Sequence, residues 1–287
     1  MKVAVYFLLL MVTMMHYNIT YNTIDTTTNK YVIGSLSAGL FSSFLGVVNH
    51  LVFCKQNNLV PVVYWDNQSL YFDKNANNTN NNVWEYYFEP VSHLAYETGD
   101  LIHRSFSSEA GAPSYYFSNR ELVCKIVEEY IHVKSHIKNK VDQFYEKYMH
   151  GKKTIGIHLR GTDKIPALPS LHRENMPWEE LFKLVNSYED HQFFIATDEQ
   201  ELLEKAKESL KGTVIYSDSI RSTNSSSLHH GNAIINKAQI GEQAVIDVLL
   251  LAKCDHFFAS YSNLSFAVIY FNQNIPYTQI YEAITTK

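Results

Sequence analysis

Short apolar runs alternate with helical periods along the C-terminal half of the chain. Strand-like runs occur at residues 154–159, 192–196, 213–216 and 256–259. Each is followed by a segment whose apolar positions recur every three or four residues, at 178–187, 199–210, 241–253 and 264–271. This alternation predicts a parallel sheet with helices on both faces, and therefore an α/β domain over residues 151–287.

The N-terminal half shows a shorter version of the same pattern. A strand is predicted at 31–34, followed by a small-residue turn, a helix from Phe41 to about Asn57, and a second strand at 59–65. A helical period over 121–148 predicts one further helix, which Gly151 ends. Residues 1–150 are therefore predicted to form a second α/β domain.

Composition and charge narrow the functional classes. The chain has 287 residues, of which 46% are hydrophobic, enough for two cores of ordinary size. The formal net charge of -5 argues against a nucleic-acid backbone as the main ligand. Cys54, Cys124 and Cys254 lie far apart in the sequence and are interpreted as buried thiols, because their spacing fits neither a zinc site nor a disulfide framework.

The first residues allow two interpretations. Lys2 and the apolar run 3–15 match a secretory leader or membrane anchor, but also a structured apolar N-terminus. The first interpretation implies a secretory or membrane-associated enzyme, and the second a cytoplasmic one. Membrane association is expected only through this segment.

Polar residues follow every predicted strand of the C-terminal half. In an open parallel sheet, ligands bind outside the carboxyl ends of the strands, which makes these residues candidates for a binding site. The alternative for any one of them is a helix cap, where Ser, Thr, Asp and Asn are common. The residues are His158, Arg160, Thr162, Asp163 and Lys164 after the first strand, Thr197 and Asp198 after the second, Ser217 and Asp218 after the third, and Ser260, Ser262 and Asn263 after the fourth.

Arg160 has the clearest chemistry of this set. A guanidinium group can bind phosphate with two parallel hydrogen bonds, and Lys164 adds a second positive charge. Such a pair can neutralise a departing diphosphate, as a sugar-nucleotide transferase requires. The alternative is a stabilising ion pair between Arg160 and Asp163. His158 lies two residues before Arg160, so both side chains point to the same face of the strand.

Several other chemistries lack support in the sequence. It contains no paired acidic motif in a setting typical of metal-dependent transferases, so we predict that no metal and no other cofactor is required. A dinucleotide-binding glycine motif, a P-loop and a nucleophile elbow are also absent from the sequence. Hydride transfer, phosphoryl transfer and acyl hydrolysis are therefore unsupported.

The segment Ile-Gly-Ile-His-Leu-Arg-Gly-Thr-Asp-Lys at 155–164 resembles the HxRRTDK-like motif of the α-1,6-fucosyltransferases. Segments 194–198, 215–219, 244–248 and 254–263 resemble later motifs of that family in the same order, and 37–43 and 88–92 resemble parts of its N-terminal domain. The resemblance implies a GT-B-like fold, with two Rossmann-like domains, parallel sheets and an active site in the cleft between them. It also implies transfer of fucose from GDP-fucose to a hydroxyl of a glycan or glycoprotein, with inversion and without a metal.

The resemblance also implies roles for individual residues. Arg160 would grip the β-phosphate, supported by His158 and Lys164. In the same way, Asp198 and Asp247 would contact the guanosine end, Ser260, Ser262 and Asn263 the diphosphate, and Gly39, Thr197 and Asp218 would complete the donor site. The resemblance does not supply the general base, because the family's acidic residue is missing after Lys164; our own candidate is Glu174, with His172 and Asp163 as alternatives.

Two departures from the family pattern keep alternatives open. Gly161 replaces the second arginine of the motif, and Ile165 to Leu168 stands where an acidic residue is expected. One alternative is a transferase of the same fold that uses another nucleotide sugar or forms another linkage. The other is an inactive relative that binds GDP-sugars or glycans.

Overall fold

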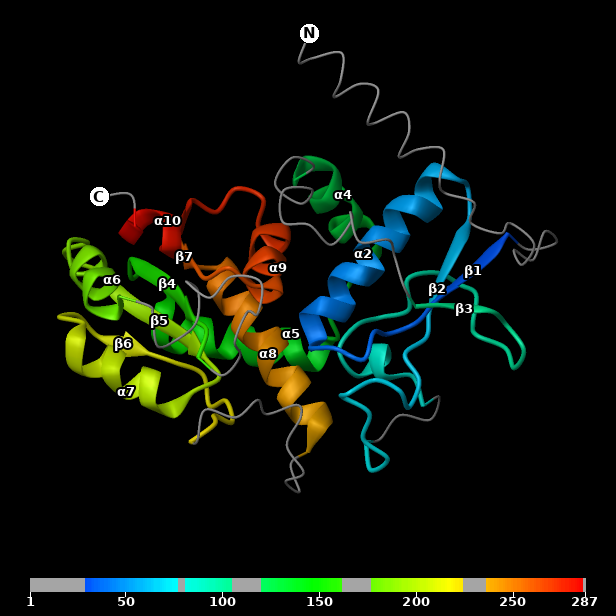
Figure 1. The fold of residues 1–287 in the computed structure, drawn as a ribbon, viewed down its shortest axis with the longest axis horizontal. Helices are drawn as coiled ribbons and strands as arrows, with labels where there is room; N and C mark the ends of the chain where they lie inside the picture. The colour runs from blue at the N-terminus through cyan, green and yellow to red at the C-terminus, as the bar shows by residue number, and fades with distance from the viewer. Residues whose placement is uncertain (1–28, 77–80, 105–119, 162–176, 224–235, 286–287) are drawn as a thin grey trace, which may run out of the picture.

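A computed structural model describes residues 29–76, 81–104, 120–161, 177–223 and 236–285. Two parallel sheets form the framework (Figure 1). The N-terminal sheet has the order β2-β1-β3, with β1 at Lys30–Ile33, β2 at Val60–Val63 and β3 at Ile102–His103. The strands β1 and β2 were predicted, whereas the two-residue β3 was not.

The C-terminal sheet has the order β6-β5-β4-β7-β8, and all its neighbouring strands are parallel. Its strands are β4 (Thr154–Leu159), β5 (Gln192–Thr197), β6 (Val214–Ile215), β7 (His256–Ala259) and β8 (Tyr277–Gln279). Four of these match the predicted strands, and β8 was missed. The parallel sheets confirm the predicted α/β class.

Helices cover both faces of the C-terminal sheet. On one face, α6 (Trp178–Val185), α7 (Gln200–Ser209) and α10 (Ile280–Thr285) pack on Ile155, Ile157 and other alternate strand residues. On the other face lie α8 (Lys237–Ala252) and α9 (Asn263–Phe271), which pack on Phe194, Phe257 and their neighbours. This division follows from the two-residue period of a strand.

A continuous hydrophobic core links the two sheets. It contains residues of β1, of α8 and α9, and of α2 (Leu40–Gln56), α4 (Arg120–Tyr130) and α5 (Ser135–Phe144). In Figure 1, α2 lies between the two lobes, and its start is close to α8. The two sheets lie on either side of residue 150 in sequence, and the domain boundary at that residue stays a prediction.

The prediction of one helix over 121–148 was wrong. Helix α4 ends at Tyr130, α5 begins at Ser135, and a π-helical turn, η2 (Tyr145–Met149), follows α5. The break occurs because Val133 forms an antiparallel bridge with Phe88, which follows the short 3-10 helix η1 (Val83–Tyr86). Backbone N–H groups of Glu89 and Lys134 complete this pairing by donating to the His132 and Tyr87 carbonyls. The pairing connects residues far apart in sequence, so the helical period could not reveal it.

Two further predictions concern the cysteines and the apolar N-terminus. All three cysteines are free and buried, as predicted. No helix within the described ranges is long and apolar enough to cross a membrane. The apolar run 3–15 lies outside the described residues, so both interpretations of it remain open.

Candidate functional site

A cavity of about 370 Å³ opens where β4 and β5 end. Its opposite wall is formed by the start of α2, and α8 and the start of α9 close its sides. The register pairs Leu159 with Thr197, so the residues after both strands lie side by side. The cavity brings together these predicted site residues: Gly39, His158, Arg160, Thr197, Asp198, Asp247, Ser262 and Asn263.

Two helix N-termini face this cavity. Gly39 is the N-cap residue of α2, and Ser42 and Ser43 donate backbone hydrogen bonds to its carbonyl. The first turn of a helix has N–H groups without partners inside the helix, and the helix dipole favours negative charge there. Asn263, at the start of α9, lines the cavity as well. The two helix ends therefore favour an anionic ligand.

His158 is part of the structure that holds the start of α9. Its Nδ1 lies 2.9 Å from Ser265 Oγ and 3.2 Å from Ser262 Oγ, and Ser262 caps the helix. Burial, and then the nearby Arg160, lower the pKa of His158 to about 3. The imidazole is therefore neutral at physiological pH, and it contacts the first turn of α9. Its role in the donor site stays a prediction. The Ser260 hydroxyl donates to the His158 carbonyl and does not line the cavity.

Arg160 and Asp198 lie at the ends of neighbouring strands. The Gly161 N–H donates to Asp198 Oδ1 at 3.2 Å, which ties the turn after β4 to the end of β5. Arg160 is partly exposed and lines the cavity. A guanidinium beside two helix N-termini concentrates positive potential at one end of the cavity.

Gly161 stands where the family motif has an arginine, and the packing leaves no room for a side chain there. A Cβ at this position would lie 2.1 Å from Glu199 Oε2, 2.7 Å from Glu199 Cβ and 2.9 Å from Leu202 Cδ1. Glu199 is only 1% exposed and Leu202 only 2%, so neither can move freely. This packing accounts for the departure from the family motif.

We therefore expect Gly161→Ala to destabilise the protein by about 1–3 kcal/mol, as is typical when a packed site is overfilled. Thermal unfolding followed by circular dichroism would measure the effect. Gly39→Ala is the matched control, because a Cβ at Gly39 would meet no atom within 4 Å. Equal melting temperatures for both variants would contradict the packing account.

Asp247 of α8 also lines the cavity, beside the turn that follows the edge strand β6. It is 6% exposed, and its two carboxylate oxygens accept hydrogen bonds from Ser217 Oγ and, at 3.3 Å, from Ser219 Oγ. Burial raises its pKa to about 6, although the two serines and Arg221 act in the opposite direction. A buried carboxylate with a raised pKa in a cavity is typical of a binding or catalytic site.

Arg221 supports this arrangement and was missed in the sequence. Its guanidinium donates to the carbonyls of Ser217 at 2.8 Å and of Ser219 at 3.0 Å. The only sequence signal was a positive charge shortly after the serine turn. Nothing in the spacing showed that the side chain folds back onto its own turn.

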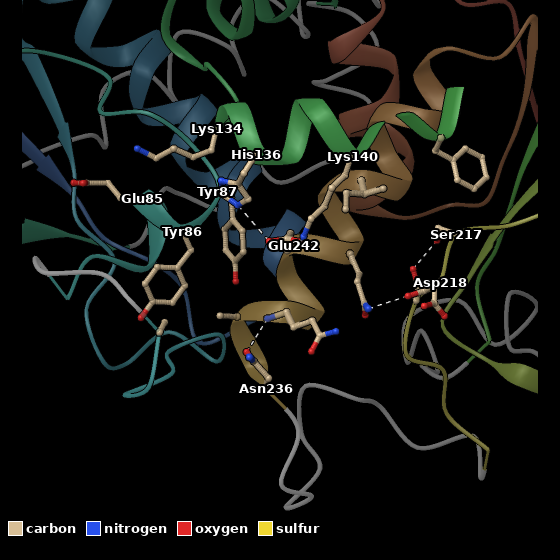
Figure 2. Close-up of a pocket in the computed structure, with 17 residues that line it drawn as sticks. Glu85, Tyr86, Tyr87, Lys134, His136, Lys140, Ser217, Asp218, Asn236 and Glu242 are labelled. Carbon is tan, nitrogen blue, oxygen red and sulfur yellow. Dashed lines mark hydrogen bonds and ion pairs between the residues drawn. The ribbon is translucent and has the colours of Figure 1, made fainter. Parts of the chain in front are cut away.

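A second cavity, of about 860 Å³, lies on the other side of this turn (Figure 2). This second cavity is lined by Asp218, Tyr86, Lys134 and Glu242, among others. Asp218 does not line the first cavity. The donor-site role expected of Asp218 stays a prediction. Other predicted site residues, Asp163, Lys164, His172 and Glu174, lie outside the described residues.

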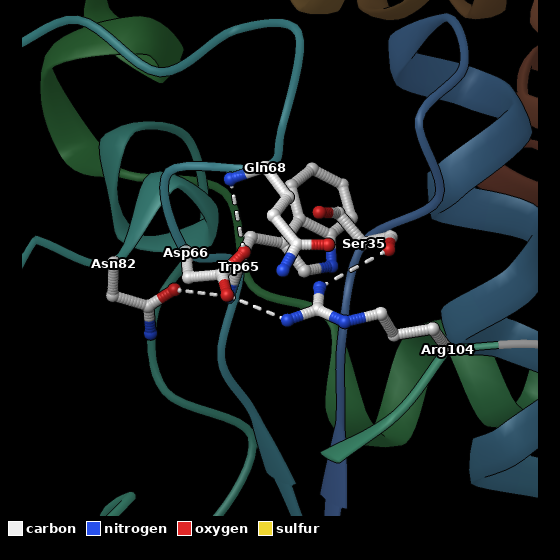
Figure 3. A network of polar contacts seen from close by, with 6 residues as sticks. All are labelled: Ser35, Trp65, Asp66, Gln68, Asn82 and Arg104. Atoms are coloured by element: carbon white, nitrogen blue, oxygen red, sulfur yellow. Dashed lines mark hydrogen bonds and ion pairs between the residues drawn. The ribbon is translucent and has the colours of Figure 1, made fainter.

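The carboxyl ends of the N-terminal strands carry a polar network that the sequence analysis did not identify (Figure 3). Arg104, directly after β3, donates to Asp66 Oδ2 at 2.5 Å and to the Ser35 carbonyl at 3.4 Å. Asn82 accepts from the Trp65 N–H at 2.9 Å. The network ties the ends of all three strands together.

Comparison with protein families decides the identity of the chain. A model described as the N- and catalytic domains of alpha-(1,6)-fucosyltransferase matches residues 116–270, which is more than half of the 287 residues. The chain belongs to the α-1,6-fucosyltransferase family. It is therefore a glycosyltransferase, and the matched region contains most of the first cavity's lining residues.

Solved structures of fucosyltransferases share the fold. NodZ alpha-1,6-fucosyltransferase co-crystallised with GDP has a TM-score of 0.53 at 17% identity, over 83% of this chain and 91% of NodZ. Fucosyltransferase NodZ from Bradyrhizobium gives 0.52 at 16% identity, over 83% and 91%. POFUT1 in complex with GDP-fucose gives 0.50 at 11% identity, over 89% of this chain and 99% of POFUT1. No curated protein sequence matches the chain.

These similarities confirm the predicted GT-B-like fold for this fucosyltransferase. Within the described part of the chain, no group of three or more His, Cys, Asp or Glu side chains is arranged to hold a metal ion. The metal independence expected from the sequence stays a prediction.

Proposed function

We propose that this fucosyltransferase transfers fucose from GDP-fucose to a hydroxyl of a glycan or glycoprotein, with inversion and without a metal. The observation that carries the proposal is the composition of the first cavity. It combines the N-termini of α2 and α9 with Arg160 and, beside the turn after the edge strand β6, the buried carboxylate of Asp247. The helix ends and Arg160 suit a diphosphate, and the carboxylate suits the N–H donors of a nucleobase.

The donor is proposed to lie along the cavity with its diphosphate beside Arg160 and the two helix ends. Asp247 then accepts hydrogen bonds from the guanine base, and Asp198 lies close enough in the wall to organise the nucleoside. That the structural relatives NodZ and POFUT1 were solved with GDP and with GDP-fucose, respectively, supports the proposed class of donor.

Catalysis then rests mainly on stabilising the leaving group. As the bond from fucose to GDP breaks, negative charge develops on the β-phosphate, and Arg160 and the helix dipoles are already oriented toward it. Inversion also requires a base near the acceptor hydroxyl. We propose Glu174 for that role, with Asp163 and His172 as alternatives, and Lys164 as a further cation of the donor site.

Incubating the enzyme with GDP-fucose and a panel of glycan and glycoprotein acceptors tests the function. The expected result is stoichiometric GDP release and a new fucosyl product whose anomeric configuration is opposite to that of the donor by NMR. Activity should persist after EDTA treatment. A protein that binds GDP but shows neither fucosyl transfer nor slow hydrolysis of GDP-fucose would be an inactive relative. Turnover with another nucleotide sugar would replace GDP-fucose as the proposed donor.

Donor affinity should depend on pH through Asp247. Its pKa of about 6 in the free enzyme means that lowering the pH from 7 to 5 protonates most of this carboxylate. Because the ionised form accepts the hydrogen bonds of the base, we expect GDP-fucose affinity to be about tenfold weaker at pH 5 than at pH 7. His158, with a pKa of about 3, stays neutral over this range.

Titrations with GDP-fucose at several pH values would measure the effect. GDP-fucose is a better probe than GDP, because a terminal phosphate has its own ionisation near pH 6. Asp247→Asn is the matched control and should bind more weakly but show no pH dependence in this range. The same pH dependence in both proteins would rule out Asp247 as its source.

A further inference from the structure

The turn after β6 is held at its backbone by one arginine. Arg221 donates one hydrogen bond to the Ser217 carbonyl and another to the Ser219 carbonyl. Its guanidinium also lies over the Tyr216 ring, 5.2 Å from the ring centre. Because the guanidinium is planar and rigid, it fixes the two carbonyls relative to each other.

Both serines hydrogen-bond through their side chains to Asp247, which lines the donor cavity, and Ser219 lines the cavity itself. Ser217 and Ser219 each donate a hydroxyl hydrogen bond to one oxygen of Asp247, and their Oγ atoms lie 2.6 Å apart. The backbone of each serine is therefore fixed by Arg221, while its hydroxyl is fixed on the carboxylate. A shift of the turn would move both hydroxyls away from Asp247 together.

Gln243 of α8 supports the turn from the other side. Its amide donates to the Asp218 carbonyl and accepts from the Ile220 N–H, both at 3.0 Å. Gln243 lines the donor cavity, whereas Arg221 does not. Arg221 therefore acts on a ligand in that cavity indirectly, through the turn that it holds and through its charge near Asp247.

We propose that Arg221 is a positioning residue that fixes the two serine hydroxyls on Asp247 and so sets the selectivity of the donor cavity for the nucleobase. This inference rests on the proposed function, in which Asp247 faces the base. Each carboxylate oxygen has two acceptor sites, and the serines use one site on each. The remaining acceptor site on each oxygen of Asp247 is available to the ligand. Two such sites suit a base with two adjacent N–H donors, and guanine has them in its imino and amino groups.

Affinities for GDP and IDP measure this selectivity, because IDP lacks only the amino group of guanine. We expect wild-type enzyme to prefer GDP by about tenfold, the typical value for one hydrogen bond to a charged group. In Arg221→Ala the preference should fall to about threefold or less, because the carboxylate loses its fixed orientation. Arg221→Lys keeps the positive charge without the rigid fork and should restore only part of the preference.

Lys207→Ala is the matched control. Lys207 also lies over the Tyr216 ring, at 5.9 Å, but no described hydrogen bond joins it to the serine turn. Its removal should leave the GDP to IDP ratio unchanged.

The ratio of the GDP affinity to the IDP affinity separates positioning from general destabilisation. A smaller folded fraction would lower the apparent affinity for both nucleotides equally and leave the ratio unchanged. An unchanged ratio in Arg221→Ala and Arg221→Lys would overturn the positioning role alone. Equal binding of GDP and IDP by wild-type enzyme would overturn it together with the contact from Asp247 to the guanine amino group, while leaving GDP-fucose as the donor. If wild-type enzyme binds no GDP, the proposed function fails first and this inference fails with it.

Discussion

Replacing Arg160 by alanine is expected to lower the rate of fucosyl transfer by roughly 10³-fold, the usual cost of removing a group that stabilises developing charge. Arg160 lines the cavity beside the N-termini of α2 and α9, where the diphosphate is proposed to leave. The side chain is partly exposed at the end of a strand, so the fold should tolerate its loss. GDP release under saturating donor, together with the melting temperature, would measure both effects.

Arg120→Ala is the matched control for this variant. Arg120 is also a partly exposed arginine, but it lies at the start of α4, donates to the Gln273 carbonyl and does not line the donor cavity. The control should retain nearly full activity. Near-normal turnover by Arg160→Ala would refute the assignment of the diphosphate to this end of the cavity.

The second large effect is expected at Gly39. A leucine at this position should weaken GDP binding by about 30-fold or more, because its side chain would occupy volume that the diphosphate needs. Its Cβ would meet no protein atom within 4 Å, and the backbone angles of φ -56° and ψ 155° suit any residue. The melting temperature should therefore fall only slightly, by the small penalty that an apolar residue carries at an N-cap.

A size series makes the Gly39 test sharper. Calorimetric titration of Gly39→Ala, Gly39→Val and Gly39→Leu with GDP should show affinity falling as the side chain grows, at nearly constant stability. Equal affinity across the series would mean that the donor does not approach α2.

Four strands of the C-terminal sheet were predictable because each lies in an apolar run beside a helical period, and this holds even for the two-residue β6. Strands β3 and β8 lie in no such run. The break between α4 and α5 depends on the bridge from Val133 to Phe88, across the N-terminal half of the chain. Local periodicity carries no information about a pairing of that kind.

The cavity shows the same division between local and non-local information. His158, Arg160 and Asp198 were predictable because parallel strands place their carboxyl ends at one edge of the sheet. The role of Arg221 was not predictable from the sequence. Its partners are backbone carbonyls, which every residue has, so no residue type nearby indicates the contact. The exclusion of a side chain at Gly161 likewise depends on where Glu199 packs, which only the fold determines.

The most direct test of the central claim is calorimetric titration of the purified protein with GDP, with UDP and CDP as controls, because it examines the donor cavity without an acceptor. We predict selective GDP binding in the micromolar range that Arg160→Ala weakens strongly. Well-folded protein that binds no GDP, or binds all three nucleotides equally, would contradict the assignment of this cavity to GDP-fucose.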